Sequence, residues 1–167
     1  METSWNLEEL REFVRKNWNS EQYLLDLISS IDRGITIFRY HFFTAKKSMS
    51  EYFDADAKPR IEHLRLVLGA SENHEYQSAK ISNQANTIAA IYTTRSLFDI
   101  FAQLVRALLL RDELTEQDCN IRKVEQRLKD GNLKECINKI LISKGFLYVN
   151  AFANVSKHRY NIKHGTS

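Results

Sequence analysis

The residues best suited to chemistry lie close to the C-terminus. Between Asn150 and His164 there are two histidines, an arginine, two lysines, three asparagines and a tyrosine, and no acidic residue. A histidine that titrates near pH 6.5 can take the proton from the 2′-hydroxyl of RNA. The planar guanidinium of an arginine can hold two oxygens of the phosphate on which charge then grows. These residue types therefore suit metal-free cleavage of RNA, with Arg159 stabilising the charge and His164 or His158 acting as the base.

The charge along the chain also points to an anion-binding surface at this end. The last acidic residue is Glu135, and residues 136–167 carry a charge of +5 although the whole chain carries only +3. Cations attract a phosphate backbone without reading its sequence. The simpler interpretation is a solvated basic helix end, where cations are favoured by the helix dipole. For nucleic-acid binding, the candidate residues are Lys157, Lys163, Asn154, Asn161 and Tyr160.

No motif in the sequence indicates a metal ion or another cofactor. The two cysteines, Cys119 and Cys136, form no CxxC pair and have no histidine at metal-ligand spacing. P-loop, GxGxxG, GxSxG, HExxH and EF-hand sequences are absent as well. We therefore expect no metal site, no cofactor and no disulfide, in keeping with a reducing compartment.

The sequence has no features of a secreted or membrane-inserted protein. The N-terminal residues mix acidic and basic side chains, unlike the basic-then-apolar layout of a signal peptide. The longest apolar stretch, Leu97 to Leu110, is interrupted by Asp99, Gln103 and Arg106, which a membrane span would not tolerate. We expect a cytoplasmic protein.

The elements that position the C-terminal residues are expected to be helices. The chain has five glycines and one proline, too few for the turns of a β-sandwich or barrel, and its apolar residues recur at three- and four-residue steps. The spacing predicts helices over 6–17, 20 to about 54, 72–111, 120–131, 133–145 and from 146 onward, with a short one after Pro59. We expect an all-α, up-and-down bundle of about five to seven helices, in a single domain spanning residues 1–167.

One long helix is expected at the centre of this bundle. Residues 72–111 contain no glycine or proline, and the second half of this stretch is apolar on most faces. Asp99 and Gln103 lie one turn apart on it, and they either form a satisfied hydrogen bond in the core or support the basic C-terminal site. Several aromatic residues fall on helical stripes, where core packing is favoured over base stacking: Phe38, Phe42, Phe98, Phe101 and Phe152.

These features together resemble the HEPN superfamily. The resemblance rests on the helical architecture, on Leu97-Phe-Asp-Ile-Phe-Ala-Gln103 and on Asn154-Val-Ser-Lys-His-Arg159. Many HEPN proteins are metal-independent ribonucleases whose arginine and histidine are separated by four to six residues, and Arg159-Tyr-Asn-Ile-Lys-His164 is similar to that motif. The resemblance implies an RNA-binding protein and ribonuclease of the toxin–antitoxin or antiphage type, with an antitoxin or another protein as a partner.

Geometry and resemblance both imply a homodimer. On a straight helix, residues five positions apart lie about 140° apart around the axis, so Arg159 and His164 do not share a face. A two-fold axis would place each of them beside its counterpart in a second copy, and HEPN proteins are generally dimers. The alternative is a catalytically silent helical module that dimerises or holds a partner protein, and whose basic end only binds anions.

Overall fold

The computed structural model describes residues 6–18, 21–54, 64, 68, 74–111 and 113–158, and over these ranges the chain forms helices and no strand. The expected all-α fold is therefore confirmed. The helices are α1 (Leu7–Asn17), α2 (Glu21–Asp54), α4 (His74–Leu109), α5 (Ile121–Arg127), α6 (Asn132–Ile142) and α7 (Lys144–His158). The short helix expected after Pro59 lies largely outside the described residues.

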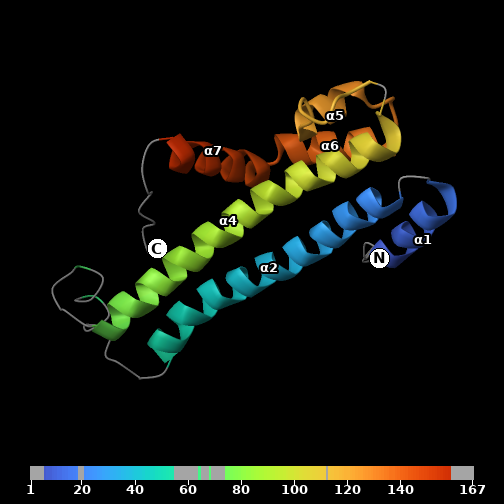
Figure 1. Cartoon of the computed structure of the whole chain (residues 1–167). Coiled ribbons are helices and arrows are strands. Elements are labelled where there is room, and N and C mark those ends of the chain that lie inside the picture. Colours follow the sequence, from blue (N-terminus) through green and yellow to red (C-terminus); the bar gives the residue numbers. More distant parts are fainter. Residues whose placement is uncertain are drawn as a thin grey trace.

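Two long antiparallel helices form the frame of the molecule (Figure 1). The helix α2 has 34 residues and α4 has 36, so each is about 50 Å long. They approach closely at Gly34, where an added Cβ would lie 2.6 Å from Cδ2 of Leu97. The expected long central helix is α4, which packs against α2, α5 and α7.

Two asparagine caps confirm the predicted starts of α1 and α5. The Asn6 Oδ1 accepts a hydrogen bond from the Glu9 amide at 3.1 Å. The Asn120 Oδ1 accepts from the amides of Arg122 and Lys123 at 3.1 and 3.0 Å. Each side chain thus satisfies amides that have no partner within the first turn of a helix.

The helix ends predicted at residues 131 and 145, both glycines, are wrong. Gly131 is the N-cap of α6 and does not close α5, which ends at Arg127. Gly145 lies inside the first turn of α7, and the break between α6 and α7 is at Ser143. The Ser143 hydroxyl causes this break, because it donates to the Ile140 carbonyl at 2.7 Å and accepts from the Phe146 amide at 3.2 Å.

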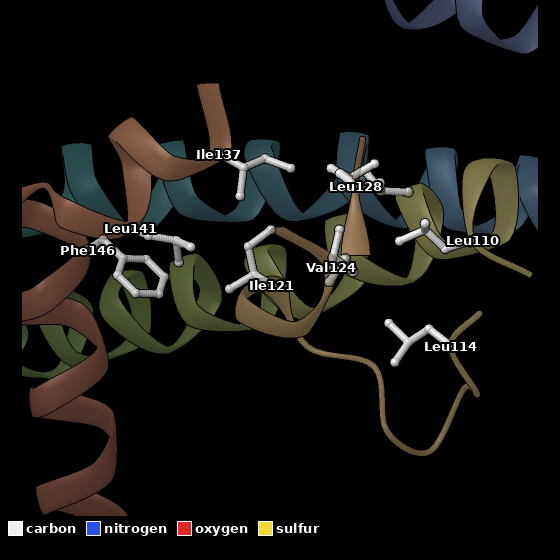
Figure 2. Close-up of a cluster of buried hydrophobic side chains, with 10 residues drawn as sticks. Leu110, Leu114, Ile121, Val124, Leu128, Ile137, Leu141 and Phe146 are labelled. Atoms are coloured by element: carbon white, nitrogen blue, oxygen red, sulfur yellow. The ribbon is translucent and has the colours of Figure 1, made fainter. Parts of the chain in front are cut away.

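The buried side chains gather at the end of the molecule where α2 begins and α4 ends. One cluster joins α1, α2 and α4 around Val14, Leu24 and Ile28, which are fully buried. The other joins the end of α4 to α5, α6 and the start of α7, as Figure 2 shows. Past this end, the second half of α2 and the first half of α4 extend as a two-helix hairpin (Figure 1). Among the described helices, none is both long enough and apolar enough to cross a membrane.

Candidate nucleic-acid interface

The sequence places its candidate residues at and beyond the end of α7. Asn154 is exposed on α7, and Lys157 and His158 are the last two positions of the helix. The other candidates lie outside the described residues: Arg159, Tyr160, Asn161, Lys163 and His164.

Aromatic contacts fix α7 along α4. The ring of Phe146 packs edge-on against Phe98 with centroids 5.0 Å apart. Two turns later, the ring of the buried Phe152 lies 6.4 Å from that of Tyr92. Since the residue numbers rise on α7 as they fall on α4, the two helices are antiparallel. From its start, α7 therefore runs in the direction of the first half of α4, and Figure 1 shows that it moves away from α4 toward its last turn.

A buried hydroxyl lies near the end of α7. The Ser156 Oγ is inaccessible to solvent and has no hydrogen-bond partner among the described residues. It belongs to the same side of α7 as Phe152, which packs on α4. A buried hydroxyl without a partner lowers the free energy of unfolding. An apolar side chain of similar size would therefore be more stable at this position.

The second half of α2 and the first half of α4 each contain a long stretch without an acidic residue. Residues 76–98 of α4 include Lys80 and Arg95 but no aspartate or glutamate. Residues 33–50 of α2 hold four arginines and lysines and likewise no acid. These two segments, which we call the acid-free hairpin, lie side by side in the structure. Carboxylates repel phosphates, so a surface without them retains its full attraction for a polyanion.

Small polar side chains hold the acid-free hairpin together. The His41 Nδ1–H donates to Oδ1 of Asn86 at 2.8 Å. The Ser48 and Ser82 hydroxyls are 2.9 Å apart, and the Asn83 Nδ2 donates to the carbonyl of Ala45 at 2.8 Å. These contacts determine which face of α2 is turned to α4, and the opposite face is left exposed.

Asp99 and Gln103 do not form the hydrogen-bonded pair that was one of the two expectations for them. The Asp99 carboxylate is exposed and forms an ion pair with Arg95, one turn earlier on α4. The Gln103 Nε2 donates to the carbonyl of Glu116 at 3.0 Å, and its Oε1 accepts from the Arg106 Nε at 3.1 Å. Gln103 therefore fastens the loop between α4 and α5. Both residues have partners of their own within the described ranges, far from the end of α7 along α4.

The structure also exposes a group of residues that the sequence analysis did not select. On α2, two aromatic and three basic side chains point away from α4, and all five are exposed. We call them the α2 stripe: Arg39, Tyr40, Phe43, Lys46 and Lys47. Phe42, expected in the core, is 50% exposed beside Phe38, because no helix among the described residues covers this side of α2. Like the C-terminal residues, this segment carries basic residues and no acidic one, a pattern that is visible in the sequence.

The cysteines show no arrangement for metal binding or nucleophilic attack. Cys136 is exposed, and Cys119 is half-buried. Burial raises the pKa of the Cys119 thiol, and the neighbouring Arg106 only partly opposes this effect. No group of histidine, cysteine or acidic residues within the described ranges could hold a metal ion.

Comparisons with protein-family models, curated proteins and solved structures gave no match for this chain.

Proposed function

We propose that this chain is a HEPN-like RNA-binding protein that cleaves RNA without a metal ion. The observation that carries the proposal is the position of α7. Phe146 and Phe152 pack on α4, so that α7 runs in the direction of the acid-free part of α4 and ends with Lys157 and His158. An RNA strand bound there would meet basic residues of α7 and α4 and no carboxylate from residues 76–98 or 144–158.

The proposed chemistry begins with His164 or His158 as the base. The base removes the proton of a 2′-hydroxyl, whose oxygen attacks the adjacent phosphorus. The bond from phosphorus to the 5′ oxygen then breaks, leaving a 2′,3′-cyclic phosphate, and the 5′ oxygen takes up a proton to become the 5′-hydroxyl. Arg159 stabilises the charge on the phosphate oxygens during this step.

The test is cleavage of single-stranded RNA in the presence of EDTA. We expect products that end in cyclic phosphate or 3′-phosphate. Replacing Arg159 with alanine should abolish cleavage while leaving the thermal midpoint unchanged, and Arg127→Ala, an exposed arginine on α5, serves as the control that keeps activity. A strict requirement for magnesium would contradict the mechanism, and unfolding of the Arg159→Ala variant would make that arginine structural.

A silent dimerisation module is the second candidate, and an apolar cavity favours it. The cavity has a volume of about 430 Å³ and lies between α2, α4, α5 and α6. Leu133 at its edge is 38% exposed, and Ile142 on the same helix is 70% exposed. A second copy is the occupant that this candidate requires, because a two-fold contact sets one patch against itself. The lining residues are Ile31, Ile35, Leu97, Phe98, Phe101, Ile121, Leu133, Cys136 and Ile140.

Light scattering with Leu133→Asp separates the two candidates. Both expect a dimer with twice the 19.6 kDa mass of the chain, since the proposed ribonuclease site also requires a second copy. If α6 forms the interface of a silent module, Leu133→Asp should give a monomer and no RNA cleavage should be found in either form. If the ribonuclease proposal holds, cleavage should be present and should depend on Arg159.

A further inference from the structure

We infer that the α2 stripe is a second nucleic-acid-binding site, specific for single strands, on which unpaired bases stack. The inference rests on the proposed RNA binding but concerns α2, far in the sequence from the proposed catalytic residues.

The five residues of the α2 stripe occupy one side of the helix. At 100° per residue, they fall within an arc of about 120°. His41, Ala45 and Ser48 contact α4, and they lie on the other side of α2. The stripe therefore faces away from α4, and the exposed fractions of its two rings are 65% for Tyr40 and 61% for Phe43.

Two cations of the stripe, Arg39 and Lys46, are available to an external anion. No acidic residue occurs between Asp32 and Glu51 on α2, or between Glu75 and Asp99 on the facing part of α4. No ion pair among the described residues involves Arg39 or Lys46. Positive charge without local neutralisation favours a polyanionic ligand.

The rings select the kind of polyanion. Tyr40 and Phe43 are three positions apart on the helix, which puts their Cβ atoms about 5–6 Å apart. Flat rings flanked by arginine and lysine are the elements that single-strand-binding surfaces use, with bases stacked on the rings and phosphates on the cations. A paired base has its faces covered by its neighbours in the duplex, so this contact requires a single strand.

An anionic membrane is a poorer fit to the same residues. A helix that lies in a membrane interface separates an apolar face from a basic face. On the α2 stripe, the cations and the rings share one arc, so that burying Tyr40 and Phe43 in lipid would bring Arg39 and Lys46 with them.

The test is a fluorescence-anisotropy titration of a labelled single-stranded RNA of about 12 nucleotides. It is carried out in the Arg159→Ala background, so that the RNA is not consumed. Tyr40→Ala and Phe43→Ala should each raise Kd by about 5- to 100-fold, and Tyr40→Leu and Phe43→Leu should also weaken binding. The control Phe13→Ala removes a ring of similar exposure, 49%, from α1, and should bind like the parent. Arg39→Gln and Lys46→Gln should each lower the slope of log K against log salt by about 0.7.

Several outcomes would overturn the inference. If the leucine variants bind like the parent, the rings serve a hydrophobic contact and no base stacks on them. If a duplex of equal length binds as tightly as the single strand, the site does not select unpaired bases. If the alanine variants lose binding to phosphatidylserine vesicles but not to RNA, the ligand is a membrane.

The test also separates this inference from the proposed function. If Tyr40→Ala and Phe43→Ala still cleave RNA and bind it with unchanged affinity, the inference of an α2 site is refuted and the ribonuclease proposal stands. If the wild-type protein cleaves no RNA but its RNA binding depends on the two rings, the ribonuclease proposal is refuted and the α2 site stands.

Discussion

The contact between α7 and α4 depends on the ring of Phe146, and its loss should be costly. Phe146 is 4% exposed, packs edge-on against Phe98 at 5.0 Å and has the guanidinium of Arg122 5.6 Å from its centroid. Truncation of a buried phenylalanine to alanine costs about 3–5 kcal/mol. With a urea m-value of about 2 kcal/mol per molar, Phe146→Ala should lower the unfolding midpoint by about 2 M.

The leucine variant isolates the part of this energy that belongs to the ring. Phe146→Leu keeps most of the apolar volume but loses the edge-to-face and cation–π contacts, which together contribute about 1–2 kcal/mol. The matched control is Leu147→Ala on the next residue, where the side chain is 49% exposed and the cost should be within about 0.5 kcal/mol.

Urea titrations followed by circular dichroism at 222 nm measure these free energies, provided that m is the same for all variants. A Phe146→Ala variant as stable as the wild type would refute the packing of α7 described above. Equal losses for Phe146→Ala and Leu147→Ala would do so as well, because burial then would not determine the cost.

Three further predictions concern a cap, a hydroxyl and the thiols. Asn120→Ala should lower the free energy of unfolding by about 1 kcal/mol, because Asn120 accepts from two amides of α5; Asn120→Asp should restore it in thermal melts. Ser156→Ala should raise stability by about 1 kcal/mol, because the buried Oγ has no partner; a lower thermal midpoint would contradict this. Cys136 should react with a disulfide reagent before Cys119, whose thiol pKa is raised by burial; equal labelling rates in mass spectrometry would be inconsistent with that order.

Local signals in the sequence predicted most of the helices. Asn6 and Asn120 are caps because their short polar side chains reach amides of the first turn, a property that does not depend on the rest of the fold. Gly131 and Gly145 were misplaced because glycine is compatible with both the start and the end of a helix. Near Gly145, the break between the helices is at Ser143, whose hydroxyl bonds to both α6 and α7.

The candidate site was less predictable, because it depends on which faces of the helices are covered by other helices. Periodicity gives Phe42 a place on a helical stripe, but it does not say that the second half of α2 extends beyond α1, α5 and α6 (Figure 1). Asp99 was assigned by its apolar surroundings in the sequence, whereas its contact with Arg95 is a local pair one turn away. Arg159 and His164 lie outside the described residues, so their role stays a prediction.

The salt dependence of RNA affinity tests the central claim most directly. In filter-binding titrations, affinity should fall steeply between about 50 and 200 mM salt, and Lys157→Ala should weaken binding by the same factor for RNAs of different sequence. Lys129→Ala, an exposed lysine in the connection between α5 and α6, should leave the affinity unchanged. If the protein binds no RNA even at the lowest salt concentration, the proposed RNA binding is contradicted.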